Sequence, residues 1–408
     1  MSWFQQVRQR FGSNVKAQGV PPPAATAQPP NDVVDDFEDN LDFDGHAQQV
    51  ATASQFQLIW WRFRKNRVAV FCAFVVAMYY LVAIFADFIA PHDPNTNRSD
   101  LTYAPPQSIQ IFDQDGNLTR PHVLGYTMEV NLETYRREFM PDPEQRHNLG
   151  LFVRGEPYML WGIIETDRRL FGVTNPEASA YILGGDRLGR DMLSRLIHGT
   201  RISMSISLIG IFLSLIVGVT LGGISGYYAG NVDMVIQRFM EFIDSIPKIP
   251  ILMGLSAAIP LTWPPLAVFL AITVILSLVG WIGMARVVRG RFLSLREEDF
   301  VMAARVAGAN ERRVMFRHML PSFYSHIIAA LTLSIPGAII GETALSFLGL
   351  GLKPPLISFG VLLQEAQNVH TVALAPWLIA PAGVMIVLVL AFNYLGDGLR
   401  DAADPYAN

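Results

Sequence analysis

Few residues in this sequence have the types and spacing that covalent chemistry requires. Gly223-Ile224-Ser225-Gly226 matches a Gly-x-Ser-Gly nucleophile pattern, and His326 lies in a different apolar stretch. A serine and a histidine act as nucleophile and base only when their side chains hydrogen-bond. The small residues around Ser225 are more typical of contacts between packed membrane helices. We therefore favour a packing role for this segment and keep an intramembrane serine protease as a rival interpretation.

The patterns that bind nucleotides or catalytic zinc are absent from the sequence. A phosphate-binding loop has the form Gly-x-x-x-x-Gly-Lys-Ser/Thr. The lysines are Lys16, Lys65, Lys248 and Lys353, and none of them lies in that pattern. The zinc-protease pattern His-Glu-x-x-His does not occur either. We therefore expect a chain without catalytic residues, cofactor or metal ion of its own, which does not itself hydrolyse ATP.

The most informative polar segment is 297–321. Strong helix formers fill 297–307. Gly308 suits the left-handed position that ends a helix, and Asn310 can cap a second helix over 311–319. The pattern predicts a helix, a turn and a second helix between two apolar stretches.

This segment also has the side chains of a docking surface. Small residues that would let a partner approach closely are Ala303, Ala304 and Ala307. Basic residues that can steer a partner by their charge are Arg305, Arg312, Arg313 and Arg317. An ordinary basic loop is the alternative for this segment taken alone.

Long apolar stretches indicate that the chain lies in a membrane. Hydrophobic residues make up 51% of the 408 residues and charged residues 16%, against about 25% in an average soluble domain. The net charge of −4 argues against a nucleic-acid binder. A spanning helix needs about 20 apolar residues. We predict six spans, at about 68–90, 202–226, 234–259, 265–288, 322–342 and 375–396.

The third predicted span is the weakest of the six. It contains the charged residues Arg238, Glu241, Asp244 and Lys248, and Pro247 and Pro250 favour kinks. Pro260, Pro264 and Pro265 separate it from the fourth span.

Charges that flank the spans predict the orientation. Four basic residues precede the first span, Arg62, Arg64, Lys65 and Arg67, whereas Asp87, Asp93 and Asp100 follow it. Because cytoplasmic flanks are enriched in lysine and arginine, the N-terminus is expected in the cytoplasm. Six crossings return the C-terminus to the same side, and the arginines after the fourth span agree with this topology. The first 20 residues lack the apolar core of a signal peptide.

The sequence divides into segments of different composition. We expect a disordered cytoplasmic tail with an acidic stretch at 1–55, although Trp3 to Phe11 could form a short interfacial helix. A juxtamembrane segment and the first helix follow at 56–90, then an extracytoplasmic insert at 91–180. An amphipathic surface helix at 181–200 precedes a core of five helices at 201–397 and a cytoplasmic tail at 398–408.

The sequence predicts a helix stripe and a turn outside the spans. In the 181–200 helix, Leu188, Met192, Leu193, Leu196 and Ile197 would share one stripe, with Arg187, Arg190 and Arg195 off it. In the insert, residues 112–117 resemble a calcium loop, but the glycine falls at the wrong position. A hairpin turn is the better interpretation there.

The 297–321 segment resembles the EAA loop of ABC importer permeases. The matching residues are Ala303-Ala304-Arg305-Val306-Ala307-Gly308 and, nine residues later, His318-Met319-Leu320-Pro321. Met302 stands where the family has its first glutamate. The resemblance implies that this loop places a short coupling helix in a groove of a separate ATPase, through Met302, Ala303, Ala304, Arg305, Gly308, Arg312, His318, Leu320 and Pro321.

Four further segments resemble the C-type permeases of dipeptide and oligopeptide importers. They are 183–191, 226–233, 342–355 and 393–405. This resemblance covers the first span and about 181–408, and it does not account for the insert. It implies an all-α membrane protein with the type I ABC importer fold and six transmembrane helices, in the bacterial inner membrane with both termini in the cytoplasm.

The same resemblance implies a function and its partners. The chain would form half of a pathway for peptides or similar small solutes together with a second, distinct permease subunit. Two ATPase subunits would hold ATP and Mg²⁺, an extracytoplasmic binding protein would deliver the solute, and lipid would surround the complex. Candidates for an outer gate are Glu342, Ser346, Phe347 and Leu348, with a structural turn as the alternative. A pore or secondary carrier without an ATPase is the remaining rival.

Overall fold

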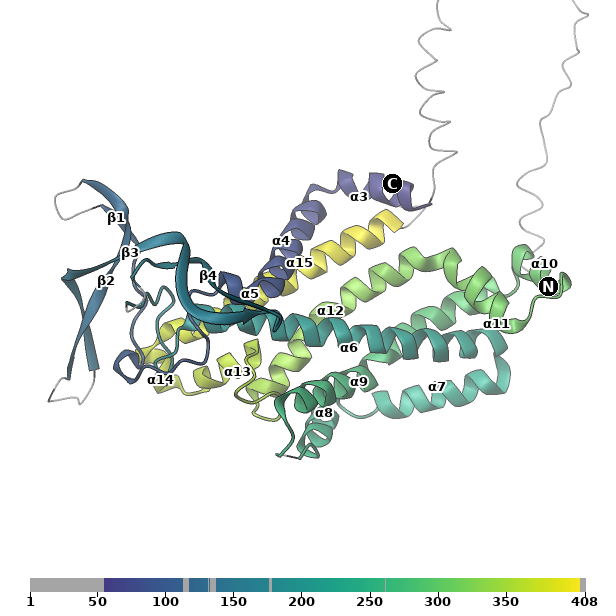
Figure 1. Cartoon of the computed structure of the whole chain (residues 1–408). Helices are drawn as coiled ribbons and strands as arrows, with labels where there is room; N and C mark the ends of the chain where they lie inside the picture. Colours follow the sequence, from purple (N-terminus) through teal and green to yellow (C-terminus); the bar gives the residue numbers. More distant parts are fainter. Residues whose placement is uncertain are drawn as a thin grey trace, which may run out of the picture. The chain divides into compact units, whose positions relative to one another are not determined.

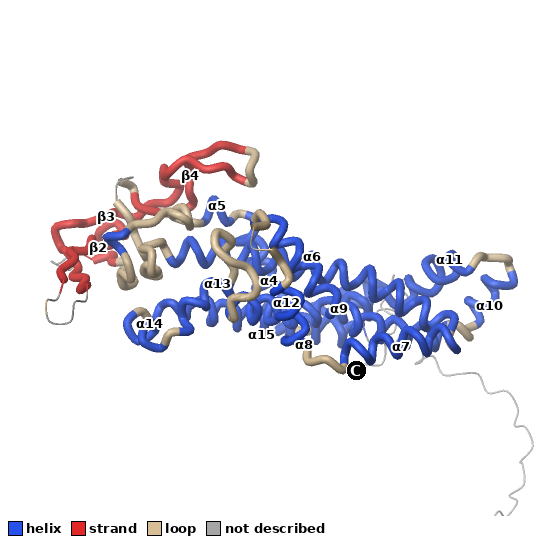
Figure 2. Tube along the Cα trace, turned by 90° about the horizontal axis from the view of Figure 1, so that it is seen from below, coloured by secondary structure: helices blue, strands red, loops and turns tan. Residues whose placement is uncertain are grey.

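The computed structural model describes residues 55–112, 117–130, 132, 137–175, 178–260 and 262–403. The expectations for the tail before residue 55, for the turn at 113–116 and for 404–408 lie outside the described residues. Residues 59–408 form one compact unit, to which the description below refers. One end of its helix bundle, the sheet end (91–191 and 348–379), carries the strands, and the other, the loop end (296–323), carries α10 and α11 (Figures 1 and 2).

Long helices make up most of the described structure. In chain order the helical elements are α3 (Gln55–Lys65), α4 (Arg67–Ile84), α5 (Ala86–Ile89), η3 (Ser99–Leu101), α6 (Met192–Tyr228), α7 (Gly230–Asp244), α8 (Lys248–Ala257), α9 (Pro265–Leu295), α10 (Asp299–Val306), α11 (Glu311–Arg313), η4 (Val314–Met319), η5 (Leu320–Phe323), α12 (Tyr324–Phe347), α13 (Phe359–Gln364), η6 (Glu365–Gln367), α14 (Val369–Leu374), η7 (Pro376–Ile379) and α15 (Ala380–Ala403).

Among the described residues, five helical segments are long and apolar enough to cross a membrane. They are α4, α6, α9, the continuous segment Glu311–Phe347 that contains α12, and Pro376–Ala403, which contains α15. The predicted third span, 234–259, is instead divided between α7 and α8. Pro247 ends the continuity between them because its ring nitrogen has no hydrogen to donate. Residues 245–247 therefore link two helices that are each too short to span alone.

The insert corrects the expectation of an all-α protein. It forms a four-stranded antiparallel sheet in the order β1 (Gln110–Phe112), β2 (Leu118–Val130), β3 (Arg137–Leu160) and β4 (Ile164–Val173). Phe112 pairs with Leu118 where the antiparallel strands β1 and β2 meet, on either side of the residues predicted to turn. Each strand pairs with the next one along the chain, so adjacent hairpins satisfy most of the backbone hydrogen bonds locally. Val123, Val153 and Val173 supply its buried hydrophobic side chains.

The structure also differs from the expected surface helix at 181–200. Residues 181–191 form a loop, in which Gly184 and Gly189 have φ angles of +74° and +69° that a helix cannot contain. Asp191 then caps α6, because its carboxylate accepts hydrogen bonds from the backbone N–H groups of Leu193 and Ser194. From Met192 onward the same helix continues through 37 residues to Tyr228, a length of about 55 Å.

Glycines bring α6 and α9 into close contact. Gly218, Gly222 and Gly226 recur every fourth residue along one face of α6. A Cβ atom on Gly222 would overlap the backbone of Ala285, and one on Gly226 would lie 2.6 Å from the Arg289 carbonyl oxygen. Such stripes of small residues let membrane helices pack backbone against backbone. The packing interpretation of the small residues around Ser225 is thereby confirmed.

Candidate functional site

The loop end is built around the turn that the sequence predicted. The helix expected over 297–307 is shorter in the structure, since α10 covers only Asp299–Val306. Gly308 has a φ of +80° and follows the end of α10, and the Asn310 carboxamide oxygen accepts a 2.9 Å hydrogen bond from Arg313 N. The second helix begins as α11 but widens into the π-helical η4. Both predicted caps are therefore confirmed, and the second helix is less regular than expected.

One side of α10 packs into the protein and the other is exposed. Val301 is buried beside Val314, Met315 and Met319, at the ends of α6 and α9. Met302 and Ala303 are exposed and Ala304 is half-buried, whereas Arg305, one helical turn after Val301, is exposed but lies on the packed side. Val306 is 87% exposed. Phe300 and Met302 on the same helix are 42% and 49% exposed, so α10 exposes several apolar side chains and not a single one.

Several large apolar residues of this surface were missed by the sequence interpretation. Phe300, Val306 and Phe316 are all more than two-fifths exposed. A short helix with alternating small, apolar and charged residues does not reveal which apolar residue faces the bundle. Of the residues that were predicted, Gly308 and Arg312 are exposed, whereas His318, Leu320 and Pro321 are half-buried where the loop rejoins the bundle.

Aromatic residues at the end of α6 attach it to the loop end. The guanidinium carbon of Arg305 lies 4.9 Å from the centre of the Tyr227 ring. The next residue, Tyr228, donates a 2.5 Å hydrogen bond from its hydroxyl group to the Glu311 carboxylate. α10 and α11 thus each contact the same helix end. Arg305 has an intramolecular partner in addition to the steering charge that was predicted for it.

An ion pair holds α7 to α9 near this end. Arg289 donates to both carboxylate oxygens of Asp233, over 2.6 and 2.7 Å. Ser225 Oγ on α6 donates to the same carboxylate over 2.5 Å. The Ser225 hydroxyl is therefore engaged by an acid, while His326 Nδ1 lies 3.4 Å from Ser325 Oγ. This arrangement gives Ser225 a structural role rather than that of a nucleophile.

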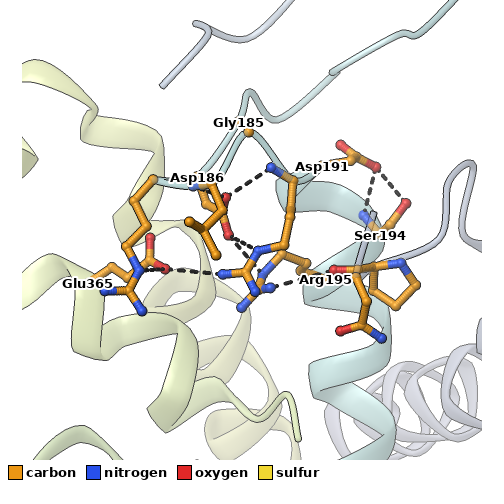
Figure 3. A network of polar contacts seen from close by, with 12 residues as sticks. Gly185, Asp186, Asp191, Ser194, Arg195 and Glu365 are labelled. Carbon is orange, nitrogen blue, oxygen red and sulfur yellow. Dashed lines mark hydrogen bonds and ion pairs between the residues drawn. The ribbon is translucent and has the colours of Figure 1, made fainter. Parts of the chain in front are cut away.

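The other end of α6 enters a buried network of charges (Figure 3). Asp186 is 1% exposed, and its carboxylate oxygen lies 2.7 Å from Arg190 Nε and 3.3 Å from Arg195 Nε. Glu365 joins the network at 3.5 Å from Arg190 and 3.4 Å from Arg187. Arg190 and Arg195, which were predicted to lie off the apolar stripe of a surface helix, are instead buried between the 183–191 loop and η6, whereas Arg187 stays 57% exposed.

A cavity of about 350 Å³ borders this network. Its lining residues are Arg187, Arg190, Arg195, Pro354, Val361, Gln364 and Glu365. No local pattern in the sequence predicts the network, because the partner carboxylates are Asp186 in the loop and Glu365 far along the chain.

The gate candidates divide into two groups. Glu342 is fully buried and accepts hydrogen bonds from Ser203 Oγ, at 3.1 Å, and Ser346 Oγ, at 2.7 Å. Ser346 also accepts from Leu352 N over 3.0 Å. These two residues connect α12 to α6 and to the following turn, and no arginine of the insert is among the described partners of Glu342. Phe347 is half-buried, and Leu348 is exposed.

Comparison with known proteins gives two family matches. Residues 218–407 match the binding-protein-dependent transport system inner membrane component. Residues 54–106 match the N-terminal transmembrane domain of oligopeptide transport permease C.

Individual relatives are similar over most of their length. The dipeptide transport system permease protein DppC of Lactococcus lactis is 32% identical over 87% of this chain and 92% of its own length. The oligopeptide transport system permease protein OppC of Haemophilus influenzae is 36% identical over 59% of this chain and 75% of its own. DppC of the same organism is 40% identical over 55% and 74%.

Proposed function

This chain belongs to the inner membrane components of binding-protein-dependent transport systems, in the branch of dipeptide and oligopeptide permeases, and from that premise we propose how it works. It is a permease subunit of an ATP-driven importer, and its relatives transport dipeptides and oligopeptides. We propose that this chain, too, carries peptides. A second permease subunit would complete the pathway, two ATPase subunits would bind ATP and Mg²⁺, and a binding protein would deliver the peptide.

The loop end would face the cytoplasm and the sheet end the outside. The four basic residues at and before the start of α4 and the arginines that end α9 support this orientation. α6 and α9 both end beside α10, because Tyr227 and Phe292 pack with Val301. The chain between them must therefore return to the sheet end. α7 and α8 together have 25 helical residues, or about 38 Å, which supports a sixth, broken crossing.

The exposed side of α10 would be the contact with the ATPase. The single observation that carries this proposal is the exposure of Val306, next to the left-handed Gly308, on a helix whose other side is attached to the bundle. Closure of the ATPase subunits on ATP would move α10. Its contacts with Tyr227 and Tyr228 would pass that movement to α6, a single helix that reaches the charge network at the sheet end.

The outer gate would lie at the turn that follows α12. Leu348 is the exposed member of its group and would line the outer mouth, with Phe347 behind it. Glu342 and Ser346 would fix the position of the turn through their hydrogen bonds to α6 and to the Leu352 backbone. A movement of α6 would reach the turn through Ser203.

Substitution Val306→Asp tests the coupling contact. A charge on the proposed apolar contact should reduce co-purification of the ATPase subunits and ATP-driven dipeptide uptake by at least tenfold, since a central apolar contact is worth about 2 kcal/mol or more. Val369→Asp is the matched control, because Val369 is 82% exposed but lies in α14 at the sheet end. Normal assembly and uptake of Val306→Asp would refute the assignment.

A further inference from the structure

The turn that joins β3 and β4 exposes an unusual set of hydrophobic side chains. Met159, Trp161, Ile163 and Ile164 are 51%, 48%, 78% and 50% exposed. No charged residue occurs within 157–164. We refer to residues 157–164 as the apolar tip. Turns that face water are usually built from polar residues, so this one is better suited to an apolar environment.

The apolar tip is attached to the end of a membrane helix. Trp161 Nε1 donates a 2.8 Å hydrogen bond to the carbonyl oxygen of Ile84, the last residue of α4. The indole ring also lies 5.5 Å from the ring of Phe85. Trp161 has a φ of +54°, a conformation that is rare for a bulky residue. These contacts fix the apolar tip at the level where α4 ends.

The surface of α4 continues onto the apolar tip. Near its end, Leu81 and Ile84 are 48% and 50% exposed, and both belong to a helix apolar enough to span a bilayer. Phe88 and Phe152 form a second pair of aromatic rings beside this surface, 6.1 Å apart. Tryptophan and tyrosine concentrate where a membrane protein passes from hydrocarbon to water. The pair of Trp161 with Phe85 is consistent with that boundary at the end of α4.

We propose that the apolar tip enters the outer leaflet of the bilayer beside α4 and anchors the sheet to the membrane surface. Each arm of the tip has about three or four residues, which gives a reach of about 10 Å. Glu156 and Glu165 bound the tip, so they would remain among the lipid headgroups. We assign lipid, and not a protein partner, as the surroundings of the apolar tip. The reason is that the tip continues the exposed side of a spanning helix and does not form a separate patch.

Spin-label accessibility tests this placement directly. In a Cys72→Ala background, which removes the only cysteine, a nitroxide would be attached at Ile163→Cys. The complete transporter, with partner subunits lacking reactive cysteines, would be placed in phosphatidylethanolamine–phosphatidylglycerol nanodiscs. Accessibility to oxygen, which concentrates in lipid, would be compared with accessibility to nickel-EDDA, which remains in water. Leu118→Cys is the matched control, since Leu118 is 77% exposed in β2.

We expect the label at 163 to favour oxygen over nickel-EDDA by severalfold and the label at 118 to show the reverse. Preference for nickel-EDDA at 163 would place the tip in water and overturn the inference. Low accessibility to both reagents would show a protein partner over the tip and would overturn it equally. The inference rests on the membrane placement of α4 in the proposed function, but coupling through Val306 is measured separately, so either can fail without the other.

Discussion

Arg305 and Tyr227 join α10 to α6, the long helix that reaches from the sheet end to the loop end. The guanidinium group lies over the face of the phenol ring, 4.9 Å from its centre. Such a cation–π contact is worth about 0.5–1 kcal/mol at exposed sites. This contact is well placed to pass movement from a docked ATPase to α6 without being needed for docking itself.

The first prediction concerns that contact. Arg305→Met should leave co-purification of the ATPase intact but lower the number of peptides imported per ATP hydrolysed by about twofold to fivefold, the factor that corresponds to the lost contact. Arg305→Lys keeps a cation at this position and should retain most of the coupling. Parallel measurements of ATPase activity and peptide uptake in proteoliposomes give this ratio. An equal number of peptides per ATP in wild type and Arg305→Met would rule out a role of the contact in passing movement to α6.

The second prediction concerns the helix contact between α6 and α9. Gly222→Ala places a methyl group against the Ala285 backbone, and overpacking of this kind costs about 1–3 kcal/mol. Gly283→Ala is the control in the same helix pair, because nothing lies within 4 Å of its added Cβ atom. Thermal unfolding of the purified complex should show a lower midpoint for Gly222→Ala alone. Similar midpoints for both variants would mean that the two helices can move apart without a loss of thermal stability.

The third prediction concerns the network at the sheet end. Asp186→Asn leaves the buried Arg190 and Arg195 without their common carboxylate, and breaking a buried ion pair costs about 3–5 kcal/mol. Glu241→Gln removes a pair with Arg238 in which both side chains are more than half exposed, and should cost no more than about 1 kcal/mol. Chemical unfolding in detergent measures both. A small change in the free energy of unfolding for Asp186→Asn would show that water replaces the carboxylate as the hydrogen-bond partner of the two arginines.

The fourth prediction concerns the pair that fixes α7 to α9. Arg289→Gln and Asp233→Asn each break a two-pronged ion pair. In a double-mutant cycle, groups that share such contacts show a coupling energy of about 0.5–3 kcal/mol. We expect the unfolding free energy of the double variant to exceed the additive value by an amount in that range. Strict additivity would indicate that the two residues do not stabilise each other.

The sequence predicted those parts of the structure that depend on local signals. Gly308 and Asn310 each perform a task that only a few residue types can, and both lie where they were expected. Four of the six predicted spans correspond closely to single long helices, and the first ends six residues early, at Ile84. Charges within 234–259 had already indicated that this segment is the least regular.

The features that were missed depend on contacts between distant segments. Arg195 looked like a surface residue because its partner, Asp186, lies across a glycine loop and its other neighbour, Glu365, lies far along the chain. The sheet was missed because β3 exposes most of its residues on both faces, so it lacks a clear apolar–polar alternation. Neither the burial of Arg195 nor the pairing of these strands is encoded within a short window of sequence.

The central claim is that the force for transport enters this chain through α10, and a photo-cross-link from position 306 tests it most directly. A benzoyl-phenylalanine at Val306, which is 87% exposed, would be activated in the complete transporter with and without ATP, and the same residue at Val369 would serve as the control. We predict a product with the ATPase from position 306 alone, whose yield changes with ATP. A fully active transporter that forms no such product would contradict the account.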